Sequence, residues 1–134
     1  MLDIDHFKQI NDQLGHPTGD SYLQRVAHRL QEIVTAHGGL LARFGGEEFI
    51  ACLPEITPEK AAEVGEQLRH GIEALTLTRQ DGQTPVTISA GLITTRRASD
   101  TLADLTQSAD QALYRAKLSG RNRVEVAGAL DARD

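Results

Sequence analysis

The chain has 134 residues, of which 40% are hydrophobic and 25% charged, a mixture typical of one globular domain. A net charge of −5 and the absence of tryptophan argue against general binding to DNA or RNA, so we expect no nucleic-acid partner. We also expect a cytoplasmic domain without direct membrane contact, because the sequence has no membrane-length apolar run and no secretory leader pattern.

The pattern of apolar and turn-forming residues predicts four helices and five strands. In chain order, the predicted elements are a strand ending at residue 4, helices over 6–14 and 18–37, hairpin strands over 40–44 and 47–54, a helix over 58–75, a strand over 84–95, a helix over 102–119 and a strand over 123–127. Thr57 followed by Pro58 is typical of a helix start, and Thr101 or Asp100 caps the last helix. Gly120 ends that helix in the position that favours glycine.

The predicted order is therefore β-α-α-β-β-α-β-α-β. Without one helix and one strand it becomes the βαββαβ order of a ferredoxin-like fold, so we expect an α+β domain with a mainly antiparallel sheet flanked by helices. The domain is expected over residues 1–127, and the small polar residues 128–134 are expected to form a flexible tail. Because Met1 lies inside the first strand, we expect the domain to lack upstream residues.

The predicted hairpin turns at Gly45 and Gly46, because two adjacent glycines can both adopt the positive φ of a tight turn. Because glycine has no Cβ, the backbone here could also pass close to a bound ligand. The single cysteine, Cys52, lies in the apolar run after this turn and is predicted to be a small buried residue.

Two acidic pairs lie at predicted strand ends, Asp3 and Asp5 after the first strand and Glu47 and Glu48 at the hairpin tip. A hairpin packed beside the first strand would bring the pairs together. Carboxylates forced close together repel unless a cation intervenes, and such hard oxygen ligands suit Mg²⁺. The alternative is that these acids are solvated at loop ends.

Three sequence blocks, DIDHFKQINDQLGHPTGD at 3–20, RFGGEEF at 43–49 and ALYRAKLSGRNRV at 112–124, resemble the signature blocks of the GGDEF family, in its order and spacing. The resemblance runs from Met1 to about Val126. It implies a diguanylate cyclase, an enzyme that condenses two GTP into cyclic di-GMP and releases two pyrophosphates. Each 3′-hydroxyl must attack the other GTP, which requires a two-fold homodimer of half-sites.

The resemblance also implies the roles of the acids. Asp3, the backbone carbonyl of Ile4 and Glu47 resemble the ligands of Mg²⁺ or Mn²⁺, two ions per half-site. Glu48 resembles the residue that helps to activate the 3′-hydroxyl. We therefore expect Glu48, Glu47 and Lys8 to form the catalytic group.

The same blocks imply how GTP would be bound. Asn11 and Asp20 resemble the pair that reads guanine, because a carboxylate can accept from its N1–H and amino group. The alternative is that Asp20 caps a helix and Asn11 lies on the surface.

The triphosphate would meet cations and backbone N–H groups. Lys8, Lys117 and Arg121 resemble the cations that bind the β- and γ-phosphates, although a helix end also favours positive side chains. His6 and Phe7 are expected to offer backbone N–H groups to phosphate, because they lie at a strand-to-helix turn.

Two departures from the family pattern are visible. Residues 36–39 read AHGG where many members carry an inhibitory RxxD product site, so we expect no product inhibition there. The family's N-terminal helical segment, which helps to wall the nucleotide pocket, is missing, and an upstream sensor or receiver domain is expected in a longer parent. The alternatives are a GGDEF-like regulator that binds GTP or cyclic di-GMP without turnover, and a ferredoxin-like interaction domain.

Overall fold

The centre of the sheet is β1 (Leu2–Ile4), the first strand of the chain, in the computed structural model, which describes residues 1–128. The strand order is β2-β3-β1-β4-β5. The other strands are β2 (Leu40–Gly45), β3 (Glu48–Cys52), β4 (Ile88–Leu92) and β5 (Val124–Val126). All neighbours are antiparallel except β4 and β5. Without β5, this is the strand order of a ferredoxin-like sheet, which confirms the predicted α+β class.

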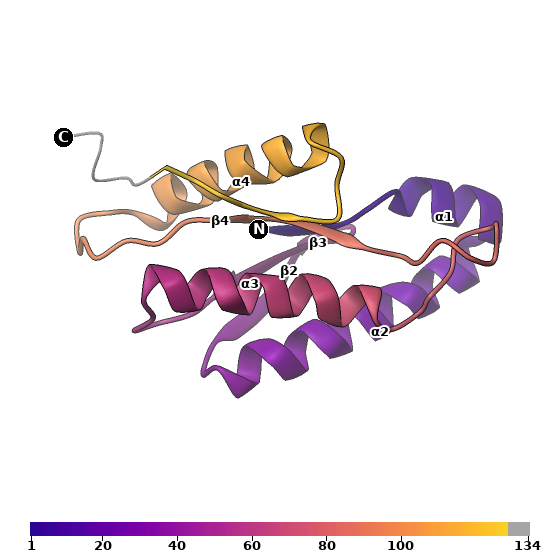
Figure 1. Ribbon diagram of the computed structural model, residues 1–134, viewed down its shortest axis with the longest axis horizontal. Coiled ribbons are helices and arrows are strands. Elements are labelled where there is room, and N and C mark those ends of the chain that lie inside the picture. The colour runs from indigo at the N-terminus through magenta and orange to yellow at the C-terminus, as the bar shows by residue number, and fades with distance from the viewer. Residues whose placement is uncertain (129–134) are drawn as a thin grey trace.

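Four helices surround this sheet: α1 (Phe7–Leu14), α2 (His16–Ala36), α3 (Pro58–Glu73) and α4 (Leu102–Leu118). Figure 1 shows α2 and α3 on one face of the sheet, α4 on the other, and α1 beyond one end. Helix α4 connects the parallel strands β4 and β5 as the crossover of a βαβ unit. None of the helices in residues 1–128 is long and apolar enough to cross a membrane.

Helix starts follow the capping signals in the sequence. The hydroxyl of Thr57 accepts a 3.1 Å hydrogen bond from the backbone N–H of Lys60, and that of Thr101 accepts one of 3.1 Å from Asp104. Helix α2 begins at His16 rather than at Thr18. Gly15, with a φ of 90°, is its N-cap and separates it from α1. The predicted tail falls, apart from Gly128, outside the described residues.

The hairpin between β2 and β3 differs from its prediction by one residue. Gly45 pairs with Glu48 inside the sheet, and the turn consists of Gly46 and Glu47. A register shift between Arg43 and Gly45 causes this displacement. Of the two glycines only Gly46 has a positive φ, of 48°, so the prediction that both adopt one was wrong.

Two apolar clusters hold the layers together. The larger lies between the sheet and the α2–α3 layer; its fully buried members include Ile10, Val26, Leu30, Val34, Val64, Ile72 and Ile88. A smaller one joins α4 to the opposite face through Met1, Ala109 and Leu113. Cys52 belongs to neither: it is exposed at the end of β3, so its predicted burial was wrong.

Candidate active site

The end of β1 and the hairpin turn lie side by side. Asp3 is the register partner of Glu48, and the backbone N–H of Ile4 donates a 3.3 Å hydrogen bond to the carbonyl of Glu47. Antiparallel pairing thus places three acidic residues, Asp3, Glu47 and Glu48, at one end of the sheet.

Asp3 is buried within this group, with an exposed fraction of 5%. Its Oδ2 lies 2.5 Å from the ammonium of Lys117, in the last turn of α4. Burial raises the pKa of Asp3, Lys117 opposes the rise, and the charges of Glu47 and Glu48 add to it. The ammonium of Lys117 thus contacts one of three neighbouring carboxylates, so the site can accept further positive charge.

Asp5 does not join the other acids. Its Oδ1 accepts a 2.6 Å hydrogen bond from the hydroxyl of Ser89, and its Oδ2 accepts from Thr87 at 2.7 Å and from the backbone N–H of Asn122 at 3.0 Å. Asp5 is thus buried, and its hydrogen bonds connect the end of β1 to β4 and to the loop after α4. The idea that two acidic pairs converge is correct for Asp3 but not for Asp5.

The chemistry of the remaining oxygen donors fits a divalent metal. Within residues 1–128, no group of three or more His, Cys, Asp or Glu side chains could by itself hold an ion. The oxygen atoms near this end include the carboxylates of Asp3, Glu47 and Glu48 and the backbone carbonyl of Ile4. This set suits Mg²⁺, which is commonly held by one or two carboxylates together with substrate phosphates and water.

Basic side chains gather around the start of α1. His6 precedes the helix in the left-handed conformation, with a φ of 57°. Burial lowers its pKa, and the nearby charges of Arg79 and Arg121 lower it further. Lys8 lies exposed in the first turn of α1. Two arginines far apart in the sequence thus lie near His6, at the helix end expected to bind phosphate.

Arg79 was missed by sequence reasoning. It lies in the loop between α3 and β4, outside the three blocks, and its guanidinium donates to the side-chain oxygen of Gln9 on α1. The hydroxyl of Tyr22 on α2 holds the same loop through a 2.7 Å hydrogen bond to the carbonyl of Thr78. No local pattern announces these pairings, because they depend on how the loop folds over α1.

Asn11, one of the two residues predicted to read guanine, packs against Gly19, which directly precedes Asp20 in the chain. A Cβ at Gly19 would lie 1.7 Å from Oδ1 of Asn11, so the Asn11 side chain occupies the space that glycine leaves. In the part of the chain that the structure describes, this Oδ1 is buried without a hydrogen-bond partner. Asp20 lies exposed inside α2, whose N-cap is Gly15, so the helix-cap alternative for Asp20 is wrong.

A groove of about 420 Å³ opens beside Asp20, between α2 and the β2–β3 hairpin. It is lined by Asp20, Leu23, Gln24, Ala27, Gln31, Leu41, Arg43 and Phe49. The guanidinium of Arg43 also donates a 2.8 Å hydrogen bond to the carbonyl of Gly46 and so holds the turn. The groove therefore links the acid at α2 to the glycine hairpin.

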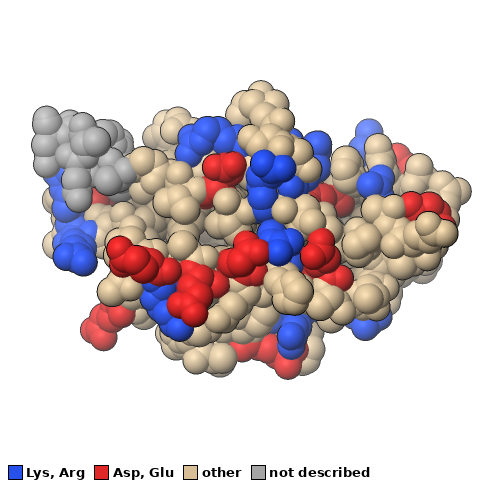
Figure 2. All heavy atoms as spheres, viewed as in Figure 1, with Lys and Arg blue, Asp and Glu red and all other residues tan. Residues whose placement is uncertain are grey.

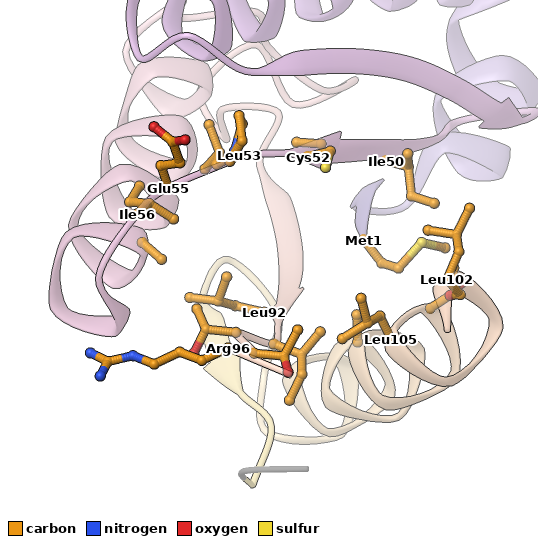
Figure 3. Close-up of a pocket in the computed structure, with 18 of the residues that line it drawn as sticks. Met1, Ile50, Cys52, Leu53, Glu55, Ile56, Leu92, Arg96, Leu102 and Leu105 are labelled. Atoms are coloured by element: carbon orange, nitrogen blue, oxygen red, sulfur yellow. The ribbon is translucent and has the colours of Figure 1, made fainter. Parts of the chain in front are cut away.

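A larger cavity, of about 550 Å³, lies elsewhere, between α4, the end of β3 and the start of α3. Figure 3 shows it between the start of β1, the ends of β3 and β4, and α4, with Met1, Ile50, Leu92, Leu102 and Leu105 around it. Its lining is mainly apolar and includes none of the predicted site residues. This apolar lining does not suit the triphosphate expected from the sequence, whose expected cations lie elsewhere.

Charge on the molecular surface is mixed. Figure 2 shows acidic and basic side chains intermingled over the face that carries α3 and α4. On α3, for example, Arg69 pairs with Glu66 at 2.5 Å and with Glu73 at 3.5 Å.

The fold and this site together define a ferredoxin-like domain in which acidic and basic side chains lie close together at one end of the sheet. The family model described as "Diguanylate cyclase, GGDEF domain" matches residues 1–123. The chain belongs to the GGDEF family of diguanylate cyclase domains.

Among curated relatives, a probable diguanylate cyclase, DgcF, of Escherichia coli is 42% identical over 130 residues, covering 94% of this chain and 41% of its own length. The diguanylate cyclase DgcP of Pseudomonas aeruginosa is 42% identical over 127 residues, covering 95% of this chain and 19% of its own length. The chain thus spans less than half of either relative.

Solved structures agree with this assignment. The active GGEEF domain of a diguanylate cyclase from Vibrio cholerae matches with a TM-score of 0.84 and 35% identity, over 95% of this chain and 80% of that one. The GGDEF domain of DgcB from Caulobacter crescentus, solved in complex with c-di-GMP, matches with a TM-score of 0.82 and 36% identity, over 93% of this chain and 74% of that one.

Proposed function

We propose that this domain is a diguanylate cyclase that condenses two GTP into cyclic di-GMP in the cytoplasm. In each of two equivalent steps, a 3′-oxygen forms a bond to the α-phosphorus of the other GTP. The bond from that phosphorus to the oxygen bridging to the β-phosphate breaks, and pyrophosphate leaves with its electron pair. The hydroxyl proton passes to a base, for which Glu48 is our candidate because it lies opposite Asp3.

Asp3, the carbonyl of Ile4 and Glu47 would hold Mg²⁺ or Mn²⁺, two ions per half-site. When bound, such ions neutralise the triphosphate and lower the pKa of the attacking hydroxyl. Lys117, Arg121 and Lys8 would bind the β- and γ-phosphates, with the backbone N–H groups of His6 and Phe7 at the start of α1.

Guanine would be selected at the groove beside α2. The Asp20 carboxylate can accept from N1–H and the exocyclic amino group, while the Asn11 amide can donate to a ring acceptor. Adenine would place an acceptor against Asp20, and such a mismatch commonly costs about 1–3 kcal/mol. Asp20→Asn should therefore reduce the preference for GTP over ATP by about tenfold to a hundredfold.

Catalysis requires a second copy of the domain. Each half-site would hold one GTP, and only a face-to-face arrangement aligns each 3′-oxygen with the other α-phosphate. We propose a two-fold homodimer, brought together in a longer parent by an upstream sensor or receiver domain.

The observation that carries this proposal is the meeting of Asp3 with Lys117 beside Glu47 and Glu48. Purified protein at high concentration would be incubated with GTP and Mg²⁺, and the products separated by chromatography. Glu47→Ala and Glu48→Ala should abolish cyclic di-GMP, while Glu63→Ala, a change of an exposed acid on α3, should not. Binding of GTP without product, at a concentration where the chain is dimeric, would instead favour a regulator that reads the nucleotide.

A further inference from the structure

Asn122 is the best-connected residue of the loop between α4 and β5. Its side-chain oxygen accepts a 2.9 Å hydrogen bond from the guanidinium of Arg69, and its side-chain nitrogen donates one of 2.7 Å to Glu73. Its backbone N–H donates to the buried carboxylate of Asp5. Both ends of the amide and its backbone donor are thus used, and they tie the loop to α3 and to the end of β1.

The loop adopts an unusual backbone conformation. Three consecutive residues have positive φ: Gly120 at 119°, Arg121 at 64° and Asn122 at 47°. The left-handed region is unfavourable for residues other than glycine, and asparagine tolerates it better than most. A segment of this kind persists only when its surroundings determine it. The hydrogen bonds of Asn122 to Arg69, Glu73 and Asp5 hold the segment in this conformation.

The loop and the end of α4 before it carry two of the cations proposed to bind phosphate, Arg121 and Lys117. Arg121 lies inside the left-handed segment, and its backbone N–H donates a 2.9 Å hydrogen bond to the carbonyl of Ala116. Lys117, which reaches Asp3, lies in the last turn of α4 immediately before the loop. The path of this loop therefore decides where Arg121 points and how α4 ends.

We propose that Asn122 is a positioning residue for phosphate binding: it holds the left-handed loop, and thereby Arg121 and Lys117, toward the site. This inference rests on the proposed function. Asn122 itself need not touch the nucleotide, because both ends of its amide are already bonded to α3. Asn122 would act in the same way as the residues that hydrogen-bond to metal ligands and orient them. The loss of such a residue commonly costs about tenfold to a hundredfold in affinity or activity.

The pairing between Asn122 and Glu73 can be inverted. Asn122→Asp would place a carboxylate against Glu73 while keeping the contact with Arg69. Adding Glu73→Gln would restore a donor–acceptor pair of opposite direction. Glu63→Gln, on an exposed part of the same helix, serves as the matched control.

Three quantities would be measured for each variant in the full chain: the melting temperature, the affinity for magnesium pyrophosphate by calorimetry, and KM and kcat for GTP. We expect Asn122→Asp to weaken pyrophosphate binding and to raise KM by about tenfold or more, with a smaller change in kcat. The double variant should recover most of both losses, and Glu63→Gln should match the parent.

A merely structural role would give a different pattern. The inference is overturned if Asn122→Asp lowers the melting temperature but leaves pyrophosphate affinity and KM unchanged at a temperature where it is folded. It is also overturned if Glu73→Gln restores stability without restoring affinity. A parent that binds pyrophosphate but makes no cyclic di-GMP contradicts the proposed function alone, because the affinity comparison still decides the role of Asn122. A parent that binds neither pyrophosphate nor GTP contradicts both the proposed function and the role of Asn122.

Discussion

The ammonium of Lys117 lies 2.5 Å from Oδ2 of Asp3, although 114 positions separate the two residues in the sequence. The contact joins the last turn of α4 to the central strand. It places a cation proposed to bind phosphate directly beside a carboxylate proposed to bind metal. Asp3 is nevertheless held in conditions that disfavour its charge, because its burial outweighs the attraction of Lys117. A buried carboxylate of this kind favours the binding of a cation, but its burial lowers the stability of the free protein.

Asp3→Asn should therefore raise the melting temperature of the metal-free protein at pH 7 by a few degrees. A raised pKa means that the folded state holds the proton more tightly than the unfolded chain. Stability then falls as pH rises from the ordinary value of 3.8 through the raised one, and the amide removes this loss. Lys117 can turn to water, because 31% of its side chain is exposed.

The same variant should make no cyclic di-GMP. Thermal melts of parent and variant at pH 4 and pH 7, with a chelator present, would measure the effect on stability. A variant that is less stable than the parent at pH 7 would show that the pair with Lys117 outweighs the burial of Asp3.

Gly19→Ala should weaken GTP binding with little change in stability. The new methyl group would displace the Asn11 amide, which is the flexible end of a side chain and can rotate away. Alanine in a helix interior is favoured over glycine by about 1 kcal/mol, which offsets part of the cost. Calorimetry with GTP and with pyrophosphate would separate the two parts of the site, since only GTP affinity should fall. An equal loss for both ligands would contradict the link between Gly19 and guanine.

Gly91→Ala should behave in the opposite way. A Cβ there would lie 2.0 Å from the backbone carbonyl of Ala109 and 2.3 Å from the backbone nitrogen of Leu113, and a helix backbone cannot rotate aside. Helix α4 must move off the sheet, at a cost of about 3 kcal/mol. Denaturant unfolding would measure this cost, with Gly128→Ala, which meets open space, as the control. A loss below about 1 kcal/mol would mean that α4 shifts freely.

Gly45→Ala tests why the hairpin carries two glycines. Gly45 has no positive φ, and a Cβ there would meet nothing within 4 Å, so the fold of residues 1–128 does not require glycine. We expect the variant to keep the parent's stability within about 0.5 kcal/mol and to lose about tenfold or more in GTP turnover, because the methyl group would face the nucleotide. Turnover like the parent's would show that the nucleotide passes elsewhere.

His6 offers a probe of phosphate binding. Its lowered pKa means that charging it destabilises the fold, so its contribution to stability is present above the ordinary value of 6.5 and is lost as pH falls below it. Pyrophosphate should raise the pKa of His6, because the anion counters Arg79 and Arg121. An NMR titration of the His6 ring with and without pyrophosphate would detect the shift, with exposed His28 as the internal control. A pKa unchanged by pyrophosphate would place phosphate away from α1.

Much of the fold could be predicted because its signals are local. The threonine caps, the glycine breaks and the apolar spacing each depend on a few neighbouring residues, and together they fixed the order of elements. The placement of the hairpin turn could not be predicted, because the register shift at Arg43–Gly45 moves it by one residue. The role of Asp5 was also missed: its partners Ser89 and Asn122 become neighbours only when β4 and the last loop pack against β1.

The position of β1 also bears on how the chain is made. β1, the first strand of the domain in chain order, takes the middle of the sheet between β3 and β4, so its pairing must wait until both of those strands have been made. Its Asp3 can pair with Lys117 only after α4 has emerged from the ribosome. A nascent chain that stops before α4 would therefore display Asp3 without the ammonium that pairs with it in the folded domain.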